Sequence, residues 1–280
     1  MNRMIDPRLL RALLGVIDHG SFTRAAEQLN MSQSTISQQI SRLEDQLGQP
    51  LLDRDARPVR MTAAGERLTG YARRILALQD EATLALGDPS GSVSLRIGLA
   101  EDIMTPDMAR LFADFSATHR RVRLDVTAGL SLALTRGYRD GDFDIIVFKE
   151  TAPEPDCRAS VPEPIGWFQG PGAPDAPDPL PFVTFPPGGL YRDQMFRRAE
   201  DLGRRWYVAF SGSSLSNVVT AVEAGLGISL RPVRAAVGRD LRRNTLFGAE
   251  PAMVASLYAW ETGGIAAPLV GAMRDVLARR

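Results

Sequence analysis

The side chains near the amino end that could do chemistry lie in a polar run after the tight turn Asn30-Met31-Ser32. Glutamine can make paired hydrogen bonds to adenine, serine and threonine can bond bases or phosphates, and arginine binds phosphate. The candidates for DNA contact are Ser32, Gln33, Ser34, Thr35, Gln38, Arg42, Arg54 and Arg57. The alternative is that this polar face is simply solvated, as many polar helix faces are.

A second group of candidates follows the predicted strands further along the chain. Ligands of α/β folds collect where the carboxyl ends of strands meet the amino ends of helices. The candidates there are Glu101, Asp102, Ser131, Phe148 with its neighbour Lys149, Ser211, Ser213 and Ser214. The carboxylates favour an amine or a hydroxyl and the serines favour an acceptor, so we expect a neutral or zwitterionic ligand. Arg192 would reverse that preference if it turned inward. Alternatively, the serines only cap a helix and the carboxylates are solvated loop residues.

The sequence predicts no catalytic centre. His19 and His119 are the only histidines, and Ser213 has no evident base beside it. Cys157 is the only cysteine, which excludes an intrachain disulfide and a cysteine-rich zinc site. Glycine-rich phosphate loops, metal-ligand clusters and the Gly-x-Ser-x-Gly elbow are absent from the sequence. We therefore expect no catalytic residues, no metal and no cofactor.

The elements that must position the first group are short helices over residues 6–50. Asp6-Pro7 begins one that ends at Gly20, and a second spans about 23–29. A third runs from near Ser32 to Leu47, with Gly48 ending it. On this third helix the apolar residues fall on one face and the polar candidates on the other, the apolar set being Ile36, Ile40, Leu43 and Leu47. Residues 51–61 predict a small hairpin, a wing that carries Arg54, Arg57 and Arg60 beside Asp53 and Asp55.

One long helix is predicted from Thr62 to about Leu86, followed by a hinge at residues 87–91. A heptad-like seam on this helix predicts a homodimer, and its members are Leu68, Ala72, Ile75, Ala82 and Leu86, with Gln79 as a polar break. The alternative is that the same residues pack against their own domain.

The rest of the chain alternates predicted strands and helices. Strands are expected at 93–99, 122–126, 143–148, 165–168, 182–185, 206–210, 228–230 and 257–260, with 151–164 as a crossover. This order predicts a parallel α/β sheet in two halves, similar to a hinged, periplasmic-binding-protein-like fold. We expect an all-α winged helix-turn-helix domain at 1–61, a linker helix and hinge at 62–91, and an effector-binding domain at 92–280. Its subdomain I takes 92–160 and 256–280, and subdomain II takes 161–255. A single doubly wound enzyme domain is the alternative.

Composition narrows the class of protein only a little. The 280 residues carry 33 basic and 33 acidic side chains, so the net charge gives no general case for nucleic acid. Residues 1–60 hold eight arginines and seven acidic residues, which is nearly balanced too. The apolar stretch Leu9–Ile17 is interrupted by Arg11 and lacks a cleavage site, so we expect no signal peptide, no membrane span and a cytoplasmic protein.

The amino-terminal motif closely resembles the signature of LysR-type transcriptional regulators. The matching residues are Gly20-Ser21-Phe22-Thr23-Arg24-Ala25-Ala26, Leu29, Ser32-Gln33, Ser37, Ile40, Leu43-Glu44, Leu47-Gly48, Leu51, Arg54, Thr62 and Gly65. The chain departs from the family pattern at Leu52, where phenylalanine is usual, and at Ser34, where proline is frequent. Looser matches lie at 137–146 and 222–228, and the segments 98–102 and 185–192 are most similar to the LrhA/PecT-like branch.

The resemblance implies a sequence-specific regulator that binds double-stranded DNA as a homodimer or homotetramer and is modulated by a small-molecule effector. The competing interpretations are a stand-alone α/β small-molecule-binding protein and an enzyme without DNA binding. The first would need a secretory signal and would leave residues 7–60 unexplained. The second lacks a catalytic set.

Overall fold

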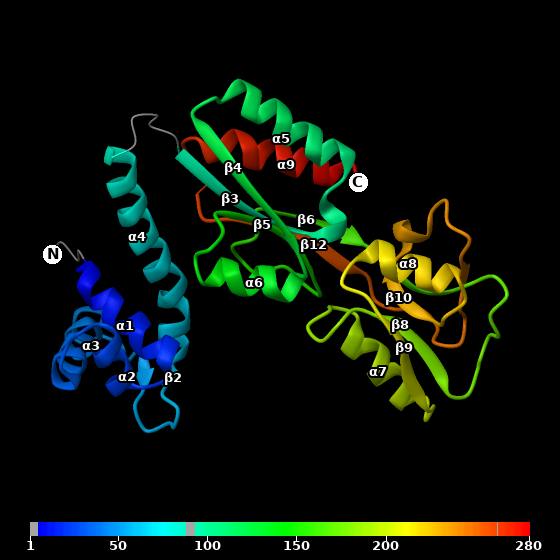
Figure 1. The fold of residues 1–280 in the computed structure, drawn as a ribbon, viewed down its shortest axis with the longest axis horizontal. Coiled ribbons are helices and arrows are strands. Elements are labelled where there is room, and N and C mark those ends of the chain that lie inside the picture. Colours follow the sequence, from blue (N-terminus) through cyan, green and yellow to red (C-terminus); the bar gives the residue numbers. More distant parts are fainter. Residues whose placement is uncertain (1–4, 88–92, 262) are drawn as a thin grey trace. The chain divides into compact units, whose positions relative to one another are not determined.

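The computed structural model describes residues 5–87, 93–261 and 263–280. The chain forms two compact units, residues 1–93 with the short segment 137–142, and residues 94–136 with 143–280 (Figure 1). Each unit has its own hydrophobic core. Among the described residues, no helix combines the length and the apolar character that crossing a membrane requires.

The first unit is helical with a small hairpin. Its elements are α1 (Pro7–His19), α2 (Phe22–Gln28), α3 (Gln33–Leu47), β1 (Leu52–Asp53), β2 (Arg60–Met61) and α4 (Ala63–Gly87). The predicted helix start at Asp6 is confirmed, because Asp6 accepts a hydrogen bond from the Arg8 backbone N–H. Ser32, near which the third helix is expected to begin, accepts one from the backbone N–H of Thr35. Gly20 ends α1 with a φ of 60°, a conformation that glycine adopts without strain.

The core of this unit explains why α3 presents one fixed face to solvent. Ile36, Ile40 and Leu43 are fully buried against α1, and Ala25 of α2 is buried with them. The hairpin pairs Leu52 with Met61 in antiparallel register, as the sequence predicts. Helix α4 begins in close contact with the hairpin, since a Cβ on Gly65 would lie 2.1 Å from the carbonyl oxygen of Leu51. The start of α4 is therefore locked to the wing.

The second unit has two lobes. Lobe I is a five-stranded sheet in the order β4-β3-β5-β12-β6, with α5 and α9 on one face and α6 on the other (Figure 1). Its elements are β3 (Val93–Ala100), η1 (Glu101–Ile103), α5 (Pro106–Thr118), β4 (Val122–Gly129), α6 (Ser131–Arg139), β5 (Ile145–Glu150), β6 (Ala159–Glu163), β12 (Met253–Ala259) and α9 (Ala266–Ala278).

Lobe II is inserted between β6 and β12. Its elements are β7 (Ile165–Gln169), β8 (Leu180–Thr184), α7 (Arg192–Asp201), β9 (Trp206–Ser211), α8 (Leu215–Glu223), β10 (Ser229–Pro232), η2 (Val233–Ala236) and β11 (Arg242–Arg243). Strands β10 and β11 flank β7, β8 pairs with β9, and a single bridge from Phe182 to Ile228 joins the two groups of strands. Trp167, Phe182 and Phe247 form the aromatic centre of its core.

The α/β class of the second unit is confirmed, but the expectation of a parallel sheet is wrong in part. Strand β12 runs antiparallel to both β5 and β6. The segment 151–164, expected as a crossover, contains β6, which is an edge strand of the sheet in lobe I. Lobe I therefore ends at Glu163 and resumes at Met253, a few residues from the expected boundaries. The predicted hinge falls mostly on residues 88–92, which lie outside the described residues.

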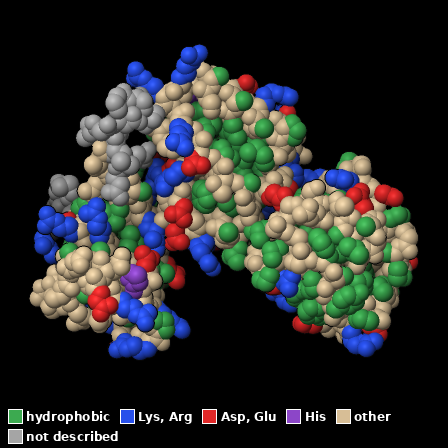
Figure 2. Space-filling model, viewed as in Figure 1, with side chains coloured by type: hydrophobic (Ala, Val, Ile, Leu, Met, Phe, Trp, Pro, Cys, Tyr) green, Lys and Arg blue, Asp and Glu red, His purple; other side chains and the backbone are tan. Residues whose placement is uncertain are grey.

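Hydrophobic side chains gather on the visible face of lobe II, over α7 and β9 (Figure 2). Phe196 and Trp206, one from each of these elements, stack with their ring centroids 4.1 Å apart. Leu202 and Tyr207 are exposed close to them in the chain. Clustered apolar surface of this kind is a common feature of interaction sites.

Candidate DNA-reading and effector sites

The exposed face of α3 brings three of the predicted DNA-contacting residues together. Gln33, Ser34 and Gln38 are exposed, and they lie opposite the buried Ile36 and Ile40. Their side chains are therefore held at a fixed angle by the core. This arrangement is able to present amide and hydroxyl groups to the edges of bases.

Two other predicted contacts at the start of α3 have local structural partners. The Ser32 hydroxyl caps the helix through the Thr35 backbone N–H at 3.1 Å. The same hydroxyl lies 2.8 Å from the hydroxyls of both Ser34 and Thr35. Ser32 and Thr35 thus stabilise the helix start, whatever else they contact.

The wing arginines are not equivalent to one another. Arg54 donates from Nη2 to Glu44 at 2.8 Å and to Ser41 at 3.1 Å, so its guanidinium joins the wing to α3. Arg57 donates from Nη1 to the carbonyl oxygen of Arg54 at 2.7 Å and folds back on the wing. Arg42, exposed further along α3, is better placed than either to bind phosphate. The structure therefore gives Arg54 a positioning role that the sequence did not predict.

Helix α4 divides the predicted seam between two faces. Ala72 is fully buried in the core of its own unit, and Leu68 packs against that core, as the alternative interpretation expected. Ile75 and Ala82 are exposed on a different face. Nothing is described for the Leu86 side chain. The predicted seam therefore includes one residue too many, because Ala72 is buried in its own unit and is not available to a partner helix.

An apolar stripe does remain exposed on α4. Tyr71, Ile75 and Leu78 are 59%, 38% and 40% exposed, and Ala82 is exposed beyond them. Their spacing of four, three and four residues places them on one line along the helix.

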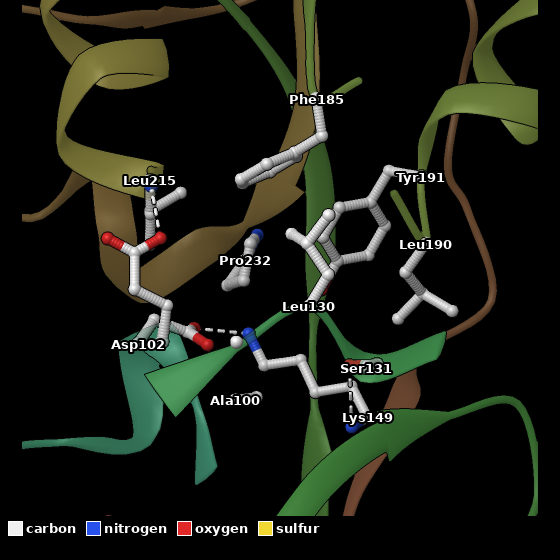
Figure 3. Close-up of a pocket in the computed structure, with 12 residues that line it drawn as sticks. Ala100, Asp102, Leu130, Ser131, Lys149, Phe185, Leu190, Tyr191, Leu215 and Pro232 are labelled. Carbon is white, nitrogen blue, oxygen red and sulfur yellow. Dashed lines mark hydrogen bonds and ion pairs between the residues drawn. The ribbon is translucent and has the colours of Figure 1, made fainter. Parts of the chain in front are cut away.

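A cavity lies between lobes I and II, where the strand ends of lobe I face the start of α8 (Figure 3). Its volume is about 40 Å³. Glu101, Asp102 and Ser131 line it, as predicted. Lys149 lines it in place of its neighbour Phe148, because successive residues of β5 point to opposite faces of the sheet. Phe148 stacks on Tyr258 instead.

The predicted serine turn does not line this cavity. Ser211 and Ser213 are exposed, and Ser214 caps α8 by accepting from the Asn217 backbone N–H at 3.1 Å. The capping alternative therefore describes Ser214. Arg192 is not turned inward, since it donates to the Phe185 carbonyl oxygen at 2.9 Å and lies over the Phe196 ring.

A cluster of charged groups forms the polar end of the cavity. Asp102 pairs with Lys149 and, at 2.8 Å, with Nη2 of Arg234 from lobe II. Arg234 also donates from Nε to Glu163 at 2.7 Å, and Arg280 lies within 3.6 Å of both carboxylates. Glu163 and Lys149 are buried. Asp102 is therefore already paired with cations, and its carboxylate is not available to bind the amine of a ligand.

Two cavity residues have features that stand out. Lys149 is the only lysine of the chain, a compositional signal that could have drawn attention to it. Tyr191 was not predicted as a site residue. It is buried, and among the described residues its hydroxyl has no hydrogen-bond partner. Burial, with the nearby charges of Asp102 and Glu163, raises the pKa of Tyr191 well above its ordinary value of 10, so the hydroxyl stays a donor.

Comparison with known families places both units. Residues 7–66 match the family model described as "Bacterial regulatory helix-turn-helix protein, lysR family", and residues 88–280 match that of the "LysR substrate binding domain".

Within the described residues, no group of three or more His, Cys, Asp or Glu side chains is arranged to hold a metal ion.

Relatives match over most of the chain. YusT of Bacillus subtilis is 31% identical over 80% of this chain and 77% of its own length. DgdR of Burkholderia cepacia is 29% identical over 86% of this chain and 82% of its own. PecT of Dickeya dadantii, at 28% over 82% and 73%, is no more similar than these two, so identity does not single out its branch. All three are named HTH-type transcriptional regulators.

Solved structures agree on the fold. The full-length regulator LysG from Corynebacterium glutamicum is 22% identical, with a TM-score of 0.59 and 98% of each chain covered. ArgP from Mycobacterium tuberculosis is 24% identical, with a TM-score of 0.58 and the same coverage. Together with the two family matches, these findings show that the chain belongs to the LysR family of bacterial transcriptional regulators, with a DNA-binding helix-turn-helix domain and a substrate-binding domain.

Proposed function

We propose that this regulator works in the cytoplasm as a homodimer, alone or as half of a homotetramer, that reads operator DNA with α3 and responds to a small molecule in the cavity between lobes I and II. One observation carries the proposal. Gln33, Ser34 and Gln38 are exposed on α3, opposite the face that the core holds in place. A helix fixed in this way can enter a major groove with its amino-terminal half.

The exposed stripe on α4 supports the dimer. An apolar line of Tyr71, Ile75, Leu78 and Ala82 has the spacing of a two-helix seam. A second copy of α4 would bury it and would bring two α3 helices to two half-sites of an imperfect palindrome.

The cavity supports the small-molecule role. It lies between the two lobes of the second unit, and polar groups converge on an apolar wall there. LysG of Corynebacterium glutamicum was solved with its effector Arg bound. We assign the effector of this chain to the cavity between lobes I and II. We do not assign arginine as that effector, because Asp102 here is already paired with Lys149 and Arg234.

Replacing Gln38 with alanine is expected to impair discrimination between operator and unrelated DNA. Loss of a paired contact to a base edge costs about 1–3 kcal/mol, which is roughly 5- to 150-fold in the specificity ratio. The measurement is binding to operator and scrambled duplexes over a range of salt concentrations.

Arg42→Ala is the matched control on the same helix. It should weaken binding to both duplexes alike and reduce the salt dependence by about one phosphate contact. A specificity ratio that is unchanged in Gln38→Ala would remove this side chain from base recognition.

A further inference from the structure

The amino end of α8 is occupied by a carboxylate from the other lobe. Glu101 of lobe I accepts a hydrogen bond at Oε2 from the backbone N–H of Leu215, the first residue of α8, at 2.8 Å. Ser214 satisfies the N–H of Asn217. Helix starts favour anions because their N–H groups and dipole point outward. Glu101 therefore takes the position in the cavity that is best suited to the carboxylate of a ligand.

The remaining charges of the cavity tolerate an added anion. Asp102 and Glu163 share Lys149, Arg234 and Arg280, which leaves two carboxylates facing three cations. Glu101 is the only other carboxylate among the residues that line the cavity in the described part of the chain. Its exchange for an external carboxylate would leave the charge of the site unchanged.

A second group in the same cavity points to a ligand. Tyr191 is buried and lines the cavity, and its hydroxyl has no acceptor among the described residues. Figure 3 shows Tyr191 on the opposite side of the cavity from Leu215, with Lys149 entering between them. A buried donor without a partner is unfavourable. An oxygen of a bound molecule would satisfy it.

The size and wall of the cavity define what can enter. Its volume of about 40 Å³ holds only about three waters. The wall around the polar end is apolar, formed by Leu130, Phe185, Leu190 and Pro232. Departure of the Glu101 side chain from α8 would give a ligand more room at the polar end, and its apolar tail would pack on this wall.

We propose that Glu101 is a built-in ligand mimic that holds lobes I and II together, and that the effector is a small carboxylate with an apolar tail, which displaces Glu101 from α8 and accepts a hydrogen bond from Tyr191. This inference rests on the proposed function of the cavity as the effector site. It reverses the expectation from sequence that Glu101 attracts an amine.

The test is calorimetric titration of the full-length protein with butyrate and benzoate, and with butyramide and butylamine as uncharged and cationic counterparts. In Glu101→Ala the internal competitor is gone, and carboxylate affinity should rise at least tenfold. Glu101→Gln, which keeps the shape of the side chain without its charge, should show a smaller rise. Tyr191→Phe should lower carboxylate affinity about tenfold in either background. Glu200→Ala, which removes an exposed carboxylate on α7, should change nothing.

Two results would overturn the inference. One is carboxylate binding that is unchanged or weaker in both Glu101 variants, while thermal melting shows them folded. The other is butylamine binding to the wild type that Glu101→Gln abolishes. Operator binding, measured on the same samples, keeps this test separate from the proposed function, because DNA recognition by α3 does not require that Glu101 be displaced.

Discussion

Replacing Ile75 with aspartate is expected to convert the proposed dimer into a monomer and to abolish protection of operator DNA at working concentrations. Ile75 lies at the centre of the exposed α4 stripe, between Tyr71 and Leu78. In a two-fold dimer the substitution places two carboxylates in one apolar seam. A buried charge without a partner costs several kcal/mol, so we expect the dimer dissociation constant to rise by at least about 100-fold.

Light scattering measures the assembly state of the variant, and footprinting measures its protection of operator DNA. Thr83→Asp is the control, because it adds the same charge at an exposed position of α4 off the stripe and should leave the assembly intact. Melting of the first unit should change little in both variants, since neither side chain is part of its core. A wild-type protein that is monomeric at micromolar concentration and still protects its operator fully would contradict the dimer.

The first unit was readable from sequence because local signals agree with its packing. Asp6, Ser32, Gly20 and Gly48 mark helix ends through their own backbone and side-chain chemistry. The period of Ile36, Ile40 and Leu43 shows which face of α3 is buried. No long-range information was needed for either.

The α4 seam could not be read in the same way. A helix that packs against its own domain on one face and, as proposed for α4, against a partner on another face carries two apolar stripes, and periodicity alone does not separate them. Ala72 and Ile75 are only three residues apart, yet one lies in the core and the other on the surface. Only the position of α1 separates them.

The sequence predicts three of the residues that line the cavity, but it does not predict the hydrogen bonds and ion pairs that these residues make. Topology alone indicates that strand ends in lobe I face helix starts in lobe II, which is why Glu101, Asp102 and Ser131 could be predicted. The pairing of Asp102 with Arg234 joins residues 132 positions apart, and that of Glu101 with α8 joins residues 114 apart. Such contacts depend on how the lobes close, and no local pattern encodes that.

Lobe II contains a charged side chain, that of Arg231, whose burial is expected to destabilise the folded protein. Arg231 on β10 is fully buried, and its hydrogen bond from Nη2 to the carbonyl oxygen of Val218 is 3.5 Å long. Among the described residues, Nε and Nη1 have no acceptor. Burial lowers the pKa of Arg231 to about 10, well below its ordinary value, and the charge of Glu223 offsets only part of that lowering. The folded state therefore disfavours the charged form.

Replacing Arg231 with methionine is thus expected to stabilise the protein. This lowering of the Arg231 pKa to about 10 corresponds to a penalty of up to about 3 kcal/mol at neutral pH. In other proteins, exchange of buried charges for apolar side chains of similar size gains about 1–4 kcal/mol. We expect a gain of about 1–3 kcal/mol in the free energy of unfolding by urea at pH 7. Arg197→Met, on the exposed side of α7, is the control and should be neutral or slightly destabilising.

The pH dependence gives this prediction its sign. Because the pKa of Arg231 is lower in the folded protein, the unfolded chain binds more protons above pH 10, and the stability of the wild type rises with pH there. The advantage of the methionine variant should be constant below about pH 9 and should shrink as the pH passes 10. A variant that is less stable than the wild type at pH 7, with the arginine control unaffected, would show that the guanidinium makes favourable contacts that outweigh the cost of its burial.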